Sequence, residues 1–286
     1  MTSRAVFGQW FPWLVLIDTE WARNHVDTIF PESEEQLSFW VAAWITYVSY
    51  CAPYDQPLEL LRDKYAFAIR QLKTAPKFRT TQYKPADRLG EHLLSFYWRG
   101  KISSEEGGLL QTYFRLCDVD AFEHGLEFVG RSLGGNQEIR RDVIERLTAL
   151  FDSLIDEAES ARVNATSLAA FGWWFSTDRV DEQWKMSRLL EVLHHTSRVD
   201  PADAVLEHLL PMAERFPLEA AEAVSMMAEG NYEPWDFEYW SPKALAVLEK
   251  AVASGRPDVK SVVAKAADRF GRLGRLEFRQ FAALET

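Results

Sequence analysis

Cysteine is scarce in this sequence. Cys51 and Cys117 are the only two, and 66 positions separate them. The chain has no CxxC spacing and no Cys/His cluster, so we expect neither a zinc site nor a disulfide framework. Both thiols are predicted to be buried structural side chains in a reducing cytoplasm.

Sequence motifs for catalysis are also missing. The chain has no GxxxxGK[ST] phosphate loop and no glycine-rich turn from a strand into a helix. His194-His195 is the only histidine pair, but adjacent helical residues point about 100° apart and cannot converge on one metal. A helix C-terminus, where histidines meet the terminal carbonyl groups, explains this pair better.

One mixed cluster, Asp118, Asp120, Glu123 and His124, could carry chemistry. Asp120 and His124 are spaced i, i+4, which would suit a metal or a general base. The alternative is that Asp118 and Asp120 cap the start of a helix, and we favour it. We therefore predict no catalytic residues, no metal, no cofactor and no enzymatic activity.

No hydrophobic run has the length of a membrane span. The apolar, aromatic segment Val6–Ile17 is too short, Pro12 interrupts it, and Asp18 and Glu20 follow it. No small-residue cleavage site comes next, so a signal peptide is not expected. We expect a cytoplasmic protein with no membrane partner.

An excess of positive charge is absent as well. The formal net charge is −11, which disfavours general nucleic-acid binding because a phosphate backbone needs a basic face. The 47% hydrophobic content, with 11 Trp and 18 Phe, is ample for a folded core and excludes a disordered chain.

Helical periodicity dominates what is present. Phe7, Trp10, Leu14, Ile17 and Trp21 recur at spacings of three and four, which places them on one helical face. This aromatic stripe is either covered by later helices or contacts another domain or subunit. No useful alternating pattern appears, so a sheet is not expected.

Further helices are predicted along the whole chain. Capping boxes at Ser33/Gln36 and Ser103/Glu106 mark two starts, and residues 74–85 form a polar surface loop. The expected spans after this loop are 86–99, 104–117, 120–133, 137–159, 165–176, 180–195, 200–215, 218–229, 242–254, 257–271 and 275–284. Asp200-Pro201 and Ser241-Pro242 are read as a cap followed by the first helical position.

The last third has a repeating character. Predicted helix pairs start at 180, 218 and 257, which suits a HEAT-like two-helix repeat. The fold class is therefore all-α: a helical array whose C-terminal part is a HEAT-like α-solenoid. We expect an irregular helical region over 1–160 and a repeat region over 161–286, continuous with the first.

Aromatic and structural motifs in this last third carry a resemblance. They are Phe171-Gly172-Trp173-Trp174-Phe175, Trp184, Leu189–Leu193, Pro217 with Ala220-Ala221, Pro234-Trp235, Leu273-Gly274 and Glu277-Phe278-Arg279. Over residues 165–281 the chain resembles the HEAT/TPR-like C-terminal helical tails of large bacterial STAND-type and related antiviral NTPases. The resemblance implies an α-solenoid that senses a partner while separate modules do the chemistry. The NTPase module itself is not in this sequence.

Two aromatic segments are candidate contact surfaces. Phe171–Phe175 could form a stacking platform, although packing between repeats is the favoured explanation. The segment Pro234–Trp240 is expected to be a long loop between two helices, with Trp235, Phe237, Tyr239 and Trp240 binding a partner protein. The alternative for this loop is that it folds back to seal a groove.

Charge is segregated near the C-terminus. Residues 199–241 carry a net charge of −9 and residues 242–280 a net charge of +5. Attraction between adjacent repeats is one explanation. The other is a basic strip over 243–279 that contacts an acidic partner or a nucleic acid, with Lys260, Lys265, Arg269, Arg272 and Arg275 as its candidate residues.

We predict a non-catalytic binding or sensor module of a bacterial antiphage defence or signalling protein. Its partner is expected to be a protein, either a phage protein or other domains or subunits of a larger complex. The alternative is a nucleic-acid-binding α-solenoid that uses the basic strip.

Overall fold

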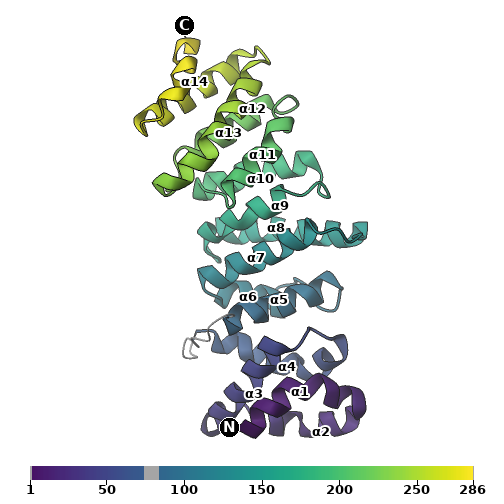
Figure 1. The fold of residues 1–286 in the computed structure, drawn as a ribbon. Helices are drawn as coiled ribbons and strands as arrows, with labels where there is room; N and C mark the ends of the chain where they lie inside the picture. The colour runs from purple at the N-terminus through teal and green to yellow at the C-terminus, as the bar shows by residue number, and fades with distance from the viewer. Residues whose placement is uncertain (1, 74–83, 286) are drawn as a thin grey trace. The chain divides into compact units, whose positions relative to one another are not determined.

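A computed structural model describes residues 2–73 and 84–285 of the chain. The predicted all-α class is confirmed: every regular element within these two ranges is a helix (Figure 1). The polar loop predicted over 74–85 falls almost entirely outside the described residues. Contacts divide the chain into two units, one ending at Gly125 and one beginning at Leu126.

The described residues of unit 1 form six α-helices, one short 3-10 helix and the start of a seventh α-helix. They are α1 (Thr2–Ile17), α2 (Thr19–Ile29), η1 (Glu34–Gln36), α3 (Leu37–Tyr50), α4 (Asp55–Gln71), α5 (Pro85–Trp98), α6 (Leu109–Leu116) and the first half of α7 (Val119–Leu133). Aromatic rings in edge-to-face contact fill its core, including Phe11, Phe30, Trp44, Tyr47 and Tyr65.

Several predicted helix starts in unit 1 are wrong. The stripe from Phe7 to Trp21 does not lie on one helix, because Asp18 caps a new one by accepting from Trp21 N at 2.9 Å. Ser33 makes no capping hydrogen bond and a 3-10 turn follows it. The helix expected from 104 begins at Leu109. The two capping-box patterns thus do not fix a helix start, whereas the unpredicted cap at Asp18 does.

Helix α1 lies unusually close to α3. A Cβ atom added at Gly8 would lie 2.0 Å from the Ala43 carbonyl oxygen, so only glycine permits this approach. The Thr46 hydroxyl, 2.7 Å from the Ala5 carbonyl oxygen, can donate to it across the same contact. One face of α1, including Phe11 and Val15, is therefore fixed against the core.

Unit 2 contains the rest of α7 and the helices that follow it. They are α8 (Arg141–Glu159), η2 (Ala165–Phe171), α9 (Gly172–Phe175), α10 (Glu182–Thr196), α11 (Ala202–Met212), α12 (Pro217–Met227), α13 (Pro234–Val252), α14 (Pro257–Arg272) and η3 (Leu276–Glu285). Helix α8 packs on η2 within this unit.

Alternate helices of unit 2 pack side by side, as in a two-helix repeat. α9, α11 and α13 form one layer, and η2, α10, α12, α14 and η3 form the other (Figure 1). The helices α10, α12 and α14 begin at Glu182, Pro217 and Pro257, 35 and 40 residues apart. This arrangement is the HEAT-like solenoid expected from the repeat spacing.

The aromatic cluster at 171–175 anchors the start of this stack. Phe171, Trp174 and Phe175 are buried, and Trp174 Nε1 donates to the Leu126 carbonyl at 2.8 Å. Trp173 is half-buried under the Arg131 guanidinium, 4.1 Å from the ring centroid. Packing between repeats, rather than a stacking platform, therefore explains this cluster.

Candidate partner-binding surfaces

The segment 234–240 is helical, so its prediction as a loop is wrong. Helix α13 begins at Pro234 and continues through Pro242, which had been read as a helix start. Glu233 and Asp236 form a capping box, in which the Glu233 N–H donates to Asp236 Oδ2 at 3.3 Å. The capping box and the burial of two aromatic residues outweigh the break expected at Pro242.

Helical geometry separates the four residues predicted there to bind a partner. Trp235 and Tyr239, spaced i, i+4, are 61% and 73% exposed. Phe237 and Trp240 are buried against Tyr232, and Trp240 also contacts Phe270. Only Trp235 and Tyr239 are therefore exposed for binding, whereas Phe237 and Trp240 are part of the core.

Ion pairs join much of the basic strip to the acidic segment before it. Lys250 pairs with Glu214 at 3.2 Å, Arg275 with Glu238 at 3.6 Å, and Lys243 and Arg269 pair with Glu207 and Glu229. This pattern supports attraction between adjacent repeats. Among the predicted strip residues, Lys260 and Lys265 have no ion pair with a side chain that the structure describes, whereas Arg272 pairs with Asp268.

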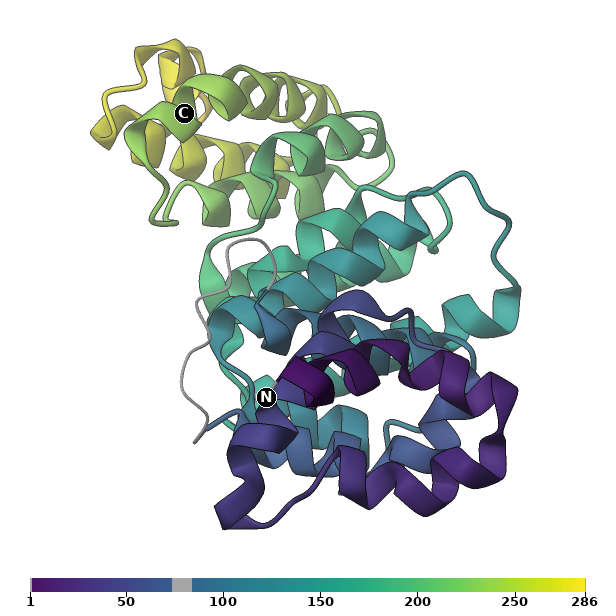
Figure 2. The ribbon, with the colours of Figure 1, turned by 60° about the horizontal axis from the view of Figure 1, so that its bottom comes forward.

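Helix α1 of unit 1 exposes a group of apolar side chains. Six of its side chains, which we call the α1 aromatic face, are between 40% and 79% exposed: Val6, Phe7, Trp10, Trp13, Leu16 and Ile17. Figure 2 shows α1, in dark purple, on the outside of the unit. The only charged residue of α1 is Arg4, which donates to the Thr28 carbonyl. The described helices thus leave much of the predicted stripe uncovered.

A groove adjoins this face. It has a volume of about 670 Å³ and lies between the second half of α1 and the start of α4. Pro12, Trp13 and Leu16 line one side, and Tyr54 and Pro57 line the other. Asp55 and Arg99, which form an ion pair, also line the groove. Exposed tryptophans beside a mostly apolar groove are typical of protein-binding surfaces, since large rings desolvate well and lose little side-chain entropy.

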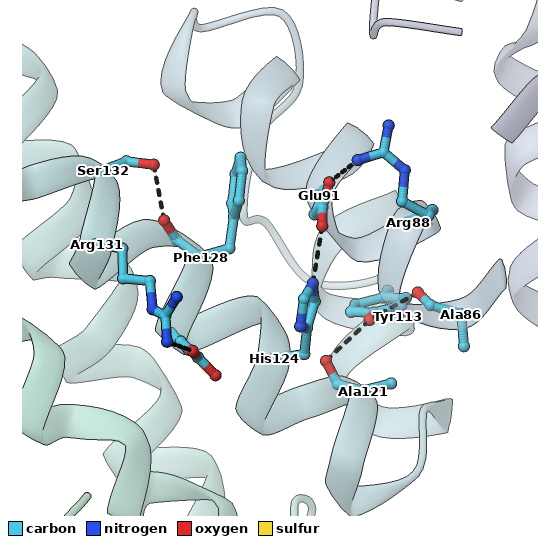
Figure 3. Close-up of polar contacts among 10 residues, drawn as sticks. Ala86, Arg88, Glu91, Tyr113, Ala121, His124, Phe128, Arg131 and Ser132 are labelled. Atoms are coloured by element: carbon cyan, nitrogen blue, oxygen red, sulfur yellow. Dashed lines mark hydrogen bonds and ion pairs between the residues drawn. The ribbon is translucent and has the colours of Figure 1, made fainter. Parts of the chain in front are cut away.

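The mixed cluster near residue 120 is taken up by structural contacts. Asp118 Oδ1 accepts from Ala121 N at 2.9 Å, which confirms capping for Asp118, whereas Asp120 pairs with Lys84 at 2.5 Å. Figure 3 shows His124 pointing toward Glu91, with Nε2 to Oε1 at 2.8 Å. In residues 2–73 and 84–285 no three His, Cys, Asp or Glu side chains are grouped to hold a metal.

The histidine pair and the cysteines also have structural positions. His194 and His195 lie in the last turn of α10, as predicted. Cys51 is buried and Cys117 half-buried, and burial raises the pKa of each thiol to about 12. Both thiols therefore stay protonated and unreactive near neutral pH.

One polar network in unit 1 was not foreseen from the sequence. Tyr47, Tyr65 and His92 are all fully buried. The Tyr65 hydroxyl is 2.7 Å from His92 Nδ1 and 3.1 Å from the Tyr47 hydroxyl, while His92 Nε2 is 2.9 Å from the Cys51 carbonyl. Because solvent does not reach it, the network is part of the core. Its residues lie far apart in the chain, so no short sequence pattern predicts that they meet.

Comparison with known proteins adds no assignment. No protein-family model matches the chain, and neither the curated proteins nor the solved structures include a match. Among the described helices none is both long enough and apolar enough to cross a membrane.

Proposed function

We propose that this chain is a non-catalytic protein-binding module, and that the α1 aromatic face is its principal contact surface. The observation that supports this proposal is the exposure of Trp10 and Trp13, 52% and 55%, on a helix with one charged residue. Buried tryptophans are among the strongest contributors to protein–protein affinity.

The size of this face fits a specific interface. With about 150–250 Å² for each large aromatic side chain, the exposed parts of the six residues sum to roughly 600 Å². The adjoining groove enlarges the surface toward the ~800 Å² that each partner contributes to a standard complex. Because the face carries no carboxylate or lysine, the partner surface it fits is apolar.

The resemblance over 165–281 supports a more specific form of this proposal, in which the chain is the sensing part of a cytoplasmic bacterial antiphage protein and its partner is a phage protein. The nucleic-acid alternative has weaker support. Arg269, Arg272 and Arg275 pair with carboxylates, which reduces the positive charge that a phosphate backbone would meet.

The test is a capture experiment with matched surface variants. Trp10→Lys/Trp13→Lys places two charges on the α1 aromatic face, and Tyr50→Lys, at an exposed residue of α3 outside that face and its groove, is the control. Each protein is used as bait in bacterial lysate with and without phage infection, and the captured proteins are quantified by mass spectrometry. We expect a partner held by the wild type and the control to be reduced at least about thirtyfold with the double variant.

Two further results are informative. Sedimentation of the purified chain shows whether the partner is a second copy, in which case the double variant becomes monomeric. Equal capture of every protein by the double variant and the wild type would exclude the α1 aromatic face as the contact surface.

A further inference from the structure

Unit 2 carries a basic groove at its C-terminal end. The groove has a volume of about 800 Å³ and is formed by α14, η3 and the residues that follow α12. Its charged lining residues are Glu229, Lys265, Asp268, Arg269, Arg272 and Arg279. Figure 1 shows α14 and the segment after it, in yellow, packed together at this end.

The positive charge in this groove is only partly neutralised. Arg269 pairs with Glu229 and donates to the Ser225 hydroxyl at 2.6 Å. Arg272 pairs with Asp268 at 2.5 Å. Lys265 and Arg279 are exposed and make no ion pair with a side chain that the structure describes. Two cations in the groove therefore remain available for an anionic partner.

Small residues keep the groove open. Ala264, Ala267, Gly271 and Ala282 lie along it, and a Cβ atom added at Gly271 would meet nothing within 4 Å. A second hollow of about 320 Å³ shares Glu229, Lys265 and Arg269 and continues past Glu222 to His194 at the end of α10. The combined surface is longer than a single ion requires and can accommodate several residues of an extended chain.

We infer that this groove binds a short acidic segment of a partner protein, whose Asp or Glu carboxylates pair with Lys265 and Arg279. Arginine matches a carboxylate with two parallel N–H donors, and lysine adds a point charge. The opposite charges supply both attraction and register. The site is separate from the α1 aromatic face and does not depend on it.

Protein rather than nucleic acid is the favoured ligand because Glu229 and Asp268 lie in the same groove. A phosphodiester backbone has negative charge at every step and would be repelled by these carboxylates. A peptide can place its acidic residues against Lys265 and Arg279 and neutral residues against Glu229.

Fluorescence anisotropy of the full chain tests this inference. The probes are a fluorescein-labelled peptide of alternating Glu and Ala, the same peptide with Gln in place of Glu, and a single-stranded DNA oligonucleotide of equal charge. We expect the Glu peptide to bind and the Gln peptide not to bind. Raising the salt from about 50 to about 200 mM should weaken the complex.

Gly271 offers a variant that changes the groove without straining the fold. Gly271→Glu adds a carboxylate in open space, and we expect it to weaken binding of the Glu peptide at least about tenfold. Gly271→Ala is the matched control and should leave the affinity unchanged. Arg279→Gln should weaken binding, whereas Lys260→Gln, on α14 but not among the groove residues, should not.

Equal affinity for the Glu and Gln peptides, or binding that Gly271→Glu does not reduce, overturns the inference. If the oligonucleotide binds more tightly than the Glu peptide and Gly271→Glu abolishes its binding, the ligand is a nucleic acid and not an acidic peptide. Trp10→Lys/Trp13→Lys should bind the Glu peptide as the wild type does. This variant therefore distinguishes loss of peptide binding in the groove from loss of partner binding at the α1 aromatic face.

Discussion

Trp174→Ala is expected to destabilise unit 2 by about 3–5 kcal/mol. The indole is fully buried, contacts Phe151 with ring centroids 5.2 Å apart, and donates to the Leu126 carbonyl at 2.8 Å. Truncation leaves a cavity at the junction of α7, α8 and α9 and removes the donor from a buried carbonyl. The midpoint of thermal unfolding, followed by circular dichroism, should fall by roughly 10 °C.

Two variants separate the causes of this loss. Trp235→Ala removes an equally large ring that is 61% exposed, and its effect should stay within about 0.5 kcal/mol. Trp174→Phe keeps most of the apolar volume but not the donor, so it should cost about 1–3 kcal/mol. If Trp174→Ala unfolds at the wild-type temperature, Trp174 is not the anchor of this core.

Unit 1 should lose about 3 kcal/mol of stability between pH 6.5 and pH 4 through His92 alone. Burial lowers the pKa of His92 from 6.5 to about 4. In the neutral ring, Nε2–H donates to the Cys51 carbonyl and Nδ1 accepts from the Tyr65 hydroxyl. When His92 is protonated, Nδ1–H donates to the Tyr65 hydroxyl oxygen. The Tyr65 hydroxyl then donates to the Tyr47 oxygen, and the Tyr47 hydroxyl proton is left without an acceptor.

The direction of this change in stability with pH follows from which state binds the proton more readily. The unfolded chain protonates this histidine below its ordinary pKa of 6.5, whereas the folded chain does so only near 4. Stability is therefore complete above pH 6.5 and falls as the pH is lowered, until the folded-state pKa is passed. Arg88, Glu91 and Arg99 also influence His92 electrostatically, but burial is the largest cause.

Urea unfolding across this pH range measures the effect. His92→Gln is the matched variant, because its amide can donate to Cys51 and accept from Tyr65 without titrating. The stability difference between wild type and variant should change by about 3 kcal/mol from pH 6.5 to pH 4. A difference that stays constant with pH would assign the acid sensitivity to other groups, such as Asp55, whose pKa is lowered by Arg99 and Lys101 against the opposing effect of burial.

Local signals were enough to predict most of the helices in the last third. Helix α14 was expected at 257–271 and spans Pro257–Arg272, and α12 was expected at 218–229 and spans Pro217–Met227. Proline at the first position and apolar residues every three or four positions act within one or two turns. They therefore remain readable without knowledge of any other part of the chain.

The same local signals failed where two of them conflicted. Ser241-Pro242 resembles a helix start, but α13 had already begun at Pro234. The outcome depended on the burial of Phe237 and Trp240 against Tyr232 and Phe270, which come from other elements. A contact between residues of different segments cannot be predicted from the short local sequence pattern of either segment.

The surfaces show the same division between local and distant causes. An apolar stripe at helical spacing indicates that α1 is amphipathic or wholly apolar. Which of its side chains are exposed depends on the face that α3 covers, and the close contact of Gly8 with Ala43 determines that face. Likewise, residue counts show that neighbouring segments carry opposite charge. Only the packing of α12 on α14 shows that Glu229 pairs with Arg269, whereas Lys265 and Arg279 make no ion pair with a described side chain. Most helix boundaries follow from neighbours along the chain, whereas the start of α13 and the availability of a side chain follow from neighbours in space.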